Sequence, residues 1–414
     1  MIVSQVFWPE NFRINDLATE WAARGHEVTV LTGLPNYPEG RVFPEFRREP
    51  ARYAALGGAE IVRVPLIPRG SRRFTLVLNY FSFALSASIV GAWKLRGRSF
   101  DVIFVFQPSP VTVGLPAVVQ RALKRAPVAF WVLDLWPETL HAVGAVRNEW
   151  ILKAVGKLVS FIYKRCDLIL AQSRSFIPSI ARYHADANIV YFPSWAEGVF
   201  SDTAVRPAPE VPELVGGFTV MFAGNIGEAQ DFPTILQAAE YLKEHSHIRW
   251  VVVGDGRMGA WVKEEVARRG LTENVLLVGK YPLERMPSFY AHADALLVSL
   301  RDEPIFAMTI PGKLQSYLAA GIPIVGMLNG EGAEVIQRAR AGVTCRAGDA
   351  RGLADAVLSL SKLSREERDA MGRNARAFSA AEFDRSRLMS ELEKMLEDLH
   401  RQFDAARATH EANR

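Results

Sequence analysis

The feature that most constrains this chain is a repeated alternation of short β-branched runs with helical patterns. In the first half, such runs lie at 2–7, 27–32, 60–64, 101–106, 127–133, 167–171 and 188–192. In the second half, they lie at 218–224, 249–256, 274–280, 294–300, 322–326 and 342–346. Strand runs that alternate with helices are typical of a parallel sheet built from βαβ units. The pattern therefore predicts an α/β protein with two Rossmann-like domains in tandem.

A proline-rich stretch separates the two halves. Residues 206–217, RPAPEVPELVGG, contain three prolines and two glycines, which stiffen and then interrupt a chain. We expect a first domain over 1–200, a linker over 201–217 and a second domain over 218–380. Residues 381–414 are expected to form a long surface helix with a frayed end. Two such domains would face each other across a cleft at the carboxyl ends of their strands, the default position for an active site.

Composition narrows the class of protein further. With 49% hydrophobic and 23% charged residues, the chain is expected to be globular rather than disordered or a coiled coil. Its two cysteines, Cys166 and Cys345, cannot form a disulfide framework, which indicates a reducing compartment. The first residues, MIVSQVF, lack the basic and apolar regions of a signal peptide. We therefore expect a cytoplasmic location.

The charges are unevenly distributed. Residues 1–200 carry 23 Lys and Arg against 15 Asp and Glu, a net +8, whereas the rest carries 26 against 30, a net −4. Residues 61–100 have no acid, and their seven basic residues flank an apolar centre from Phe74 to Trp93. The seven are Arg63, Arg69, Arg72, Arg73, Lys94, Arg96 and Arg98.

The apolar centre is long enough to span a membrane, but Asn79, Tyr80 and three serines interrupt it. We expect instead a helix that docks on an anionic membrane without crossing it, aided by a second basic amphipathic segment at 149–165. This places the chain at the inner face of the plasma membrane. A nucleic-acid partner is not expected, because no reader motif accompanies the basic residues.

Glycine-bearing turns follow several strands of the second half. Gly254 to Gly259 read G-x-G-x-x-G between a strand and a helix, the pattern of a dinucleotide site. Such a site needs an acid at the end of the next strand, which here ends in Lys280. We therefore expect Gly254, Gly256 and Arg257 to approach a phosphate of some other ligand. The turn FAGNIGEAQDF (222–232) has the same position after its strand.

A stronger candidate for a phosphate site is IPGKLQSYLAAG (310–321). Pro311 suits a helix start, Gly312 removes bulk, and Lys313 adds a cation beside the first-turn N–H groups. The alternative is an ordinary helix start with a solvated lysine. A metal is not expected, because the chain has no D-x-D pair and its histidines lack ligand spacing. Lys280, Lys313 and Arg257 would then meet the charge of a leaving group.

Loops of the first half carry candidate acceptor residues. Asp134 ends a buried strand and Trp136 follows it, a carboxylate beside an aromatic ring that suits a sugar, although Asp134 could also only cap a turn. The loops after the first two strands supply the other candidates, Glu10, Asn11, Arg13, Asn36 and Tyr37. In SLRDEPIF, Asp302 and Glu303 could hold hydroxyls or simply be solvated.

The motifs together resemble glycosyltransferase family 4, a retaining family with the GT-B fold. Within it, the chain is most similar to bacterial surface-polysaccharide enzymes of the N-acetyl-L-fucosaminyltransferase type. The resemblance covers residues 2–380 and rests on WPENFRINDLA, RGHEVTVLTGLPNYPEG, DLWPETL, GNIGEAQDF, VGDGRM, SLRDEPIF and P-x-K-LQSYLAAG. It implies a nucleotide-sugar site in the second domain, an acceptor site in the first, a terminal helix that returns to the first domain, and no metal.

The resemblance also implies roles for single residues. Lys280 and Lys313 would lie at the diphosphate, and Gly224 and Gly227, with Asn225 between them, would form its backbone cradle. Glu303 would be the first of the family's two spaced glutamates. The second is replaced by Ser316, Asp134 stands where many members have histidine, and the stretch from Asn225 to Gln230 replaces an Arg and a Lys of many members. The catalytic residues implied are Asp134, Glu303, Lys280 and Lys313.

The expected activity is a retaining, metal-independent sugar transfer. The donor would be a UDP-sugar such as UDP-N-acetyl-L-fucosamine, and the acceptor a polyprenyl-diphosphate-linked saccharide in O-antigen, capsule or exopolysaccharide biosynthesis. Two alternatives stay open: a GT-B-fold UDP-sugar epimerase and a non-catalytic peripheral membrane protein that only binds nucleotide.

Overall fold

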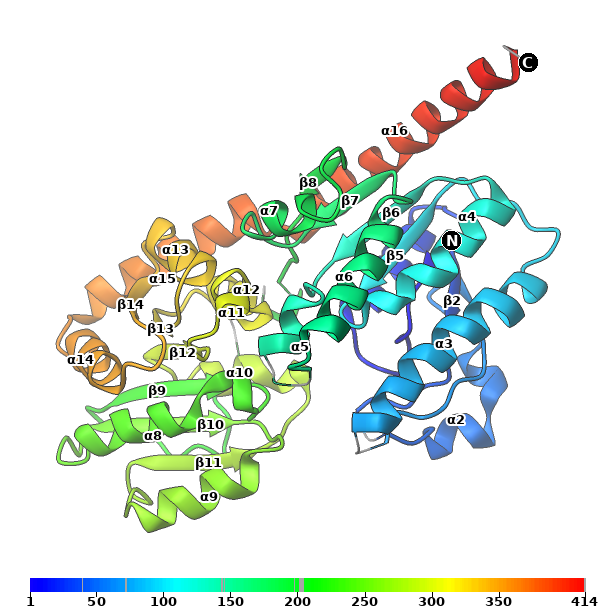
Figure 1. Cartoon of the computed structure of the whole chain (residues 1–414). Coiled ribbons are helices and arrows are strands. Elements are labelled where there is room, and N and C mark those ends of the chain that lie inside the picture. The colour runs from blue at the N-terminus through cyan, green and yellow to red at the C-terminus, as the bar shows by residue number, and fades with distance from the viewer. Residues whose placement is uncertain are drawn as a thin grey trace. The chain divides into compact units, whose positions relative to one another are not determined.

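The structure of the chain is a computed structural model (Figure 1). The residues that it describes are 1–38, 40–70, 73–142, 144, 146–196, 198–200 and 205–412. The chain divides into two compact units, which we call unit 1 and unit 2. Unit 1 is Met1–Phe192 together with Met389–Arg414, and unit 2 is Pro193–Leu388. Each contains a parallel sheet with helices, so the predicted α/β class with two Rossmann-like domains is confirmed.

Unit 1 is built on an eight-stranded sheet in the order β3-β4-β2-β1-β5-β6-β7-β8, parallel except for the β3–β4 pair. The strands are β1 Ile2–Val3, β2 Thr29–Thr32, β3 Ala55–Leu56, β4 Ala59–Arg63, β5 Ile103–Gln107, β6 Val128–Val132, β7 Leu168–Ala171 and β8 Ile189–Tyr191. The strand order reverses between β1 and β5. In such a sheet, ligands bind outside the carboxyl ends of the strands at this switch point.

The helices of unit 1 follow its strands. They are α1 Arg13–Ala23, α2 Pro44–Arg48, α3 Arg73–Lys94, α4 Gly114–Lys124, α5 Glu138–Ala142, α6 Glu149–Tyr163 and α7 Phe176–Ala181. Helix α3 packs along α4, and α4 contacts α6, so these three lie side by side (Figure 1). Sequence reasoning did not identify β3, a two-residue edge strand without a hydrophobic pattern.

The last helix, α16 (Arg385–Ala412), joins unit 1 from Met389 onward. The Glu393 carboxylate accepts a hydrogen bond from Arg24 at 2.8 Å and lies 2.5 Å from His26 Nε2. Leu392 and Leu399 are buried. The chain therefore has the C-terminal helix that we predicted, returning to the first domain.

Unit 2 has a six-stranded parallel sheet in the order β11-β10-β9-β12-β13-β14. The strands are β9 Phe218–Ala223, β10 Ile248–Val253, β11 Val275–Gly279, β12 Ala295–Ser299, β13 Ile324–Met327 and β14 Gly342–Cys345. This is the strand order of a dinucleotide-binding Rossmann sheet, with its switch point between β9 and β12. Side chains of β9 alternate between two core clusters, so both faces of the sheet are covered.

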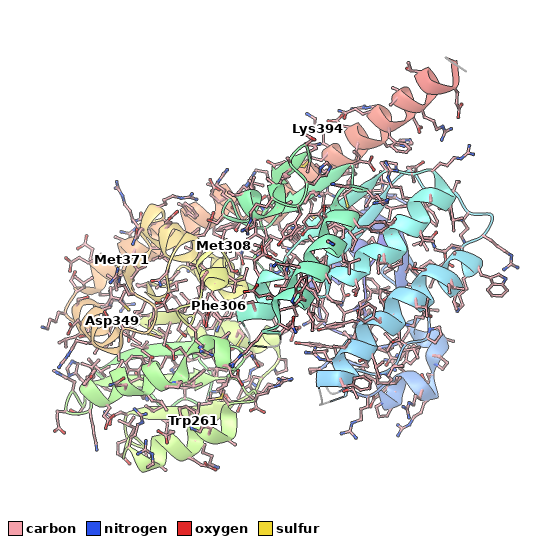
Figure 2. The ribbon with its side chains drawn as sticks, in the orientation of Figure 1. Trp261, Phe306, Met308, Asp349, Met371 and Lys394 are labelled. Carbon is pink, nitrogen blue, oxygen red and sulfur yellow. The ribbon has the colours of Figure 1, made fainter. Side chains whose placement is uncertain are left out.

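The helices of unit 2 are α8 Phe232–Tyr241, α9 Gly259–Arg268, α10 Met286–Tyr290, α11 Pro304–Ala307, α12 Gly312–Ala320, α13 Glu331–Arg338, α14 Ala350–Ser361 and α15 Arg365–Glu382. Two of the residues labelled in Figure 2, Asp349 and Trp261, show what positions two of these helices. Asp349 begins α14 by accepting a hydrogen bond from the Gly352 N–H at 2.8 Å. Trp261 lies on α9 and packs against the core cluster on that face of the sheet.

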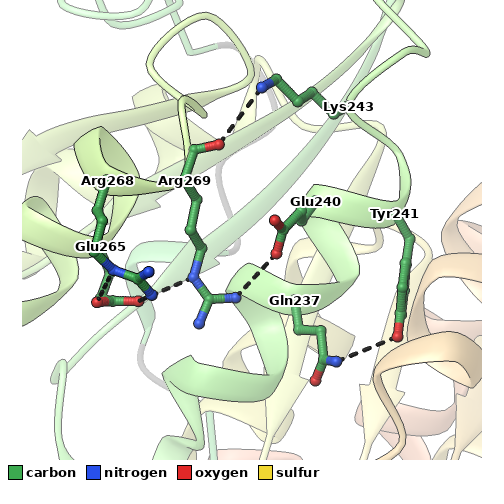
Figure 3. Close-up of polar contacts among 7 residues, drawn as sticks. All are labelled: Gln237, Glu240, Tyr241, Lys243, Glu265, Arg268 and Arg269. Carbon is green, nitrogen blue, oxygen red and sulfur yellow. Dashed lines mark hydrogen bonds and ion pairs between the residues drawn. The ribbon is translucent and has the colours of Figure 1, made fainter.

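A group of charged residues lies at the junction of α8 and α9, where the Arg269–Glu240 ion pair joins the two helices (Figure 3). Glu265 binds Arg268 at 2.7 Å and Arg269 at 3.0 Å, and Arg269 also lies 3.3 Å from Glu240. Lys243 donates to the Arg269 carbonyl at 3.5 Å. The two arginines are therefore paired with acids and Lys243 is bonded to the backbone, and we assign these residues to packing rather than to a ligand.

The segment expected as a linker, 201–217, packs on unit 2 over the part that the structure describes, whereas residues 201–204 lie outside it. Ala208 and Val211 are buried in a core cluster of unit 2, and the Ala208 N–H donates to the Ser288 carbonyl at 2.9 Å. The division between the units falls at Pro193. The prolines restrict the backbone of this segment, but they do not prevent it from packing on the core of unit 2.

Candidate active site

The loops after β9 and β10 are packed backbone to backbone at the carboxyl edge of the unit 2 sheet. The Ile226 N–H donates to the Asp255 carbonyl at 2.9 Å, and the Met258 N–H donates to the Ile226 carbonyl at 3.0 Å. A Cβ at Gly254 would lie 1.9 Å from the Gly224 carbonyl oxygen, and one at Gly256 would lie 2.4 Å from that of Ile226. Only glycine fits at either position. The G-x-G-x-x-G pattern is thus explained by this close packing.

Lys313 lies against the same loops. Its Nζ is 3.6 Å from the centre of the Phe222 ring near the end of β9, and a Cβ at Gly224 would lie 3.2 Å from Nζ. The residue as a whole is half-buried, but Nζ itself is buried and has no hydrogen-bond partner among the described residues. Burial lowers the pKa of Lys313 to about 7. A buried cation without a counter-charge indicates a site for an anion.

Helix α12 holds Lys313 in place. The helix begins after Pro311 with Gly312 and Lys313 in its first turn, where the helix dipole also favours an anion. The buried Tyr317 hydroxyl donates to the Ala223 carbonyl at 3.1 Å and accepts from the Ala223 N–H at 3.0 Å. These two hydrogen bonds to Ala223, the last residue of β9, fix the helix on the strand. Sequence reasoning missed Tyr317, although its position one turn after Lys313 could have identified it.

We call Gly224, Gly254, Gly256, Lys313 and the start of α12 the anion site. Asn225 belongs to it, since a Cβ at Gly227 or at Gly256 would lie 2.6 Å from its side-chain amide. Gly227 donates its N–H to Gln230 Oε1 at 3.1 Å.

The other predicted donor residues are less closely tied to the anion site. Lys280 and Arg257 are exposed. Glu303 is half-buried at the start of α11. Ser316 is buried within α12. The structure thus brings the glycine turns and Lys313 together, and among the described residues it records no contact that joins Lys280, Arg257 or Glu303 to them.

In unit 1, Glu10 joins two loops at the carboxyl edge of the sheet. Its buried carboxylate accepts N–H groups of Phe7 at 3.1 Å, Asn36 at 2.7 Å and Tyr37 at 2.7 Å. Burial raises its pKa, and these hydrogen bonds oppose the rise. The side chain of Asn36, also buried, donates to the Leu34 carbonyl and accepts from the Arg69 N–H at 3.0 Å. The structure gives Glu10 and Asn36 a role in shaping these loops.

Asp134 follows β6 and lies within a polar and aromatic cluster. It accepts hydrogen bonds from Trp136 Nε1 at 3.0 Å and from the Thr139 hydroxyl, and these two donors and the Ser109 side chain favour a lower pKa of the carboxyl group. Burial raises the pKa of Asp134 to about 6. The turn-capping alternative is incomplete, because these donors are side chains rather than first-turn N–H groups.

Tyr80 of α3 extends this cluster. Its ring packs edge-on against Trp136, with the ring centres 6.0 Å apart, and the Ser109 side chain favours a lower pKa of its hydroxyl. Burial raises the pKa of Tyr80, and the positive charge of nearby Arg69 opposes the rise. We call Arg69, Tyr80, Ser109, Asp134 and Trp136 the unit 1 cluster. Sequence reasoning missed Tyr80, because within an apolar run it read as an interruption.

The remaining predicted acceptor residues surround Tyr37. Its partly exposed ring lies 5.3 Å from that of Phe12 and 5.1 Å from Arg69 Cζ. Asn11 is exposed beside Phe12, and Arg13 is half-buried at the start of α1.

Two family models match the chain. The model "Glycosyl transferase 4-like domain" matches residues 11–195, within unit 1 apart from its last three residues, and the model "Glycosyl transferases group 1" matches residues 217–362, within unit 2.

Curated relatives agree with these models. The glycosyl transferase WcaI of Escherichia coli (strain K12), named for colanic acid biosynthesis, is 26% identical over 316 residues, 73% of this chain and 75% of its own. N-acetyl-alpha-D-glucosaminyl L-malate synthase of Bacillus anthracis is 23% identical over 397 residues, 93% of each chain.

Solved structures with the same fold include HepE of Anabaena in complex with UDP and glucose. It has a TM-score of 0.66 and 13% identity, over 96% of this chain and 98% of its own. Sucrose-phosphate synthase from Thermosynechococcus elongatus has a TM-score of 0.69 and 16% identity, over 95% and 93%. With a 4-like domain in unit 1, a group 1 domain in unit 2 and the GT-B fold, the chain belongs to the glycosyltransferases.

Proposed function

We propose that the protein transfers a sugar, with retention of its anomeric configuration, from a UDP-sugar to a lipid-linked saccharide at an anionic membrane surface. The observation that carries the proposal is Lys313, whose buried ammonium has no counter-charge among the described residues and lies at the start of α12, beside Gly224. A donor diphosphate would supply the missing negative charge. On the resemblance of the motifs, we propose an N-acetylated amino-deoxysugar as the group transferred.

The chemistry asked of the anion site is to stabilise a leaving group. The bond from the sugar C1 to the diphosphate oxygen breaks, and its electron pair stays on that oxygen. The acceptor hydroxyl bonds to C1 on the same face, and its proton goes to the departing diphosphate. Lys313 and the start of α12 would stabilise the charge that develops on the phosphate. We propose that no metal is required for this.

We assign acceptor binding to the unit 1 cluster. The Asp134 carboxylate is half-buried and suits a sugar hydroxyl, whereas the Trp136 ring is buried and supports the cluster by packing on Tyr80. Because the pKa of Asp134 is about 6, this carboxylate is mostly ionised at neutral pH and can accept a hydrogen bond from an acceptor hydroxyl. Asp134 is thus proposed to orient the acceptor.

Helix α3 carries the proposed membrane surface. Large apolar side chains recur along it at three- and four-residue intervals and are exposed, which places them in one stripe. The stripe consists of Phe74, Val77, Phe81, Leu85, Ile89 and Trp93. The Arg96 guanidinium lies 4.5 Å from the Trp93 ring at its end. Apolar residues flanked by cations suit an anionic bilayer.

Helix α6 adds to this surface. It exposes Trp150 and Phe161, with Lys153 5.4 Å from the first ring and Arg165 3.7 Å from the second. Of the basic residues expected to meet lipid, Arg98 instead pairs with Glu60. Arg72 and the side chain of Arg73 lie outside the described residues.

Packing argues that α3 docks rather than spans. In the described part of the chain, Phe74–Lys94 is long and apolar enough to cross a membrane, with a mean hydropathy of 1.6. Its other face, however, is built into unit 1. Phe83 and Ala87 are fully buried, and buried Asn79 bonds the Gln5 side chain at 2.6 Å and the Ile67 carbonyl at 2.7 Å. Surrounding α3 with lipid would remove these contacts.

Activity is tested by incubating the pure protein with UDP-sugars, with and without a polyprenyl-diphosphate saccharide. Transfer of sugar only when the acceptor is present supports the proposal. Conversion of the UDP-sugar without acceptor would identify an epimerase, and binding of UDP without turnover in either mixture would identify a non-catalytic protein.

Membrane docking is tested by vesicle sedimentation. Leu85→Glu with Ile89→Glu should abolish binding to vesicles with 30% anionic lipid, whereas Val215→Glu, at another exposed apolar residue, should not. Binding should also weaken at 1 M salt, where screening shortens to about 3 Å. Equal binding to neutral and anionic vesicles would contradict the docking proposal.

A further inference from the structure

Arg69 differs from many arginines of unit 1 because, in the part of the chain that the structure describes, no carboxylate is recorded as its ion-pair partner. Arg24, Arg98 and Arg121 each bind a described acid at 2.9 Å or less. Within the described residues, the structure records no ion pair for the Arg69 guanidinium. Its contact is with the Tyr37 ring, 5.1 Å away.

The position of Arg69 is nevertheless well defined. Its backbone N–H donates to Asn36 Oδ1 at 3.0 Å, and Asn36 is buried. The Tyr37 ring contacts the guanidinium and also packs on Phe12. A cation held by its backbone and by a ring keeps its N–H donors available for a ligand.

Arg69 also lies between two parts of the proposed acceptor surface. Two residues before it, the Ile67 carbonyl accepts a hydrogen bond from Asn79 at 2.7 Å and the Ile67 N–H donates to the Ser82 hydroxyl at 2.9 Å. These bonds hold the segment against α3 on both sides of Tyr80, and the charge of Arg69 opposes the rise in the pKa of Tyr80. Arg69 is also five residues before Phe74, the first exposed side chain of the apolar stripe on α3. A molecule with its sugar at the unit 1 cluster and its hydrocarbon on this stripe would place its linking group near Arg69.

We infer that Arg69 binds a phosphate of the acceptor, the group that links the saccharide to its lipid, and so selects phosphate-linked acceptors over other glycosides. The inference rests on the proposed function, since it assigns to Arg69 the recognition of the proposed acceptor. A guanidinium suits this role, because its planar donors match two phosphate oxygens. Arg69 is a binding residue here and takes no part in bond breaking.

The test compares two acceptors with the same saccharide, one on an alkyl diphosphate and one on a plain alkyl chain, in neutral detergent micelles. We expect Arg69→Gln to raise KM for the diphosphate acceptor about 10- to 100-fold, as for a lost charge-assisted hydrogen bond, and to leave the plain glycoside unchanged. Arg69→Lys should recover part of the loss. Arg48→Gln, the control at an exposed arginine of α2, should change neither.

A binding measurement separates this inference from the proposed transfer. With saturating UDP present to fill the anion site, a short prenyl diphosphate should bind the wild-type protein, and Arg69→Gln should weaken it about tenfold or more. This result is readable even if no sugar is transferred. Equal affinity in the two proteins, or an equal loss of both acceptors in kinetics, would overturn the inference. Loss of binding to anionic vesicles alone would assign Arg69 to lipid headgroups instead.

Discussion

Replacing Lys313 with methionine should stabilise the protein in a way that depends on pH. Below pH 7, the lysine is protonated in both the folded and the unfolded chain, and the folded protein bears the full cost of a buried ammonium. The pKa falls from 10.5 to about 7, which sets that cost at about 5 kcal/mol at most. Between these values the folded protein has released the proton and the unfolded chain still holds it, so the cost shrinks as the pH rises.

Methionine fills a similar volume without charge, so Lys313→Met removes this cost. The gain in the free energy of unfolding should be at most about 5 kcal/mol at pH 6 and about 1 kcal/mol at pH 9.5. Urea denaturation of both proteins at the two pH values measures it, and packing differences cancel because they do not depend on pH. Lys280→Met is the matched control, since it removes the same charge from an exposed position.

The same lysine should take up a proton when UDP binds. At pH 8.5 the amine of the free protein is mostly neutral, and the diphosphate favours the ammonium. Calorimetry in two buffers with different ionisation heats should therefore show uptake of nearly one proton by the wild type and none by Lys313→Met. Equal stability gains at pH 6 and pH 9.5, or binding of UDP without proton uptake, would refute the reasoning.

Three further outcomes are expected. Tyr317→Phe should cost about 1–3 kcal/mol in urea denaturation, because it leaves the buried Ala223 groups without their side-chain partner; an unchanged midpoint would contradict the anchoring role of this tyrosine. Asp134→Asn should abolish the fall in transfer rate that we expect below about pH 6, and a wild-type rate that is flat down to pH 5 would remove Asp134 from acceptor binding. Transfer should persist in excess EDTA, and a loss that Mg²⁺ restores would defeat the metal-independent reaction.

The fold followed from local pattern because, apart from β3, the strands of both sheets are short, mostly apolar runs that alternate with helices. The runs VAFWV of β6 and FTVMFA of β9 are apolar at almost every position, which is typical of strands buried on both faces of a parallel sheet. The edge strand β3 could not be found this way, since two residues carry no periodicity. The proline-rich segment was expected to be a linker, but Ala208 and Val211 are buried in the core of unit 2 although prolines surround them.

At the candidate site, the sequence indicated which residue types are present but not which way their side chains point. Lys313 and the glycine turns were recognised because helix starts and close backbone turns have local signatures. Glu10 was expected to face a ligand, yet its carboxylate turns back to three N–H groups, two of them from a loop 26 and 27 residues away. Tyr80 shows the converse, because the partners that define it, Ser109 and Trp136, come from other loops.

The junction of α16 with unit 1 bears on how the two halves can be studied separately. A protein cut at the limits of the matched domains would lack Glu393, and would leave Arg24 and His26 without their carboxylate and the sites of Leu392 and Leu399 uncovered. The first half needs these residues although almost two hundred others come between them in the chain. Supplying 385–412 as a separate peptide, or attaching it ahead of residue 1 by circular permutation, should therefore restore these contacts in the isolated half.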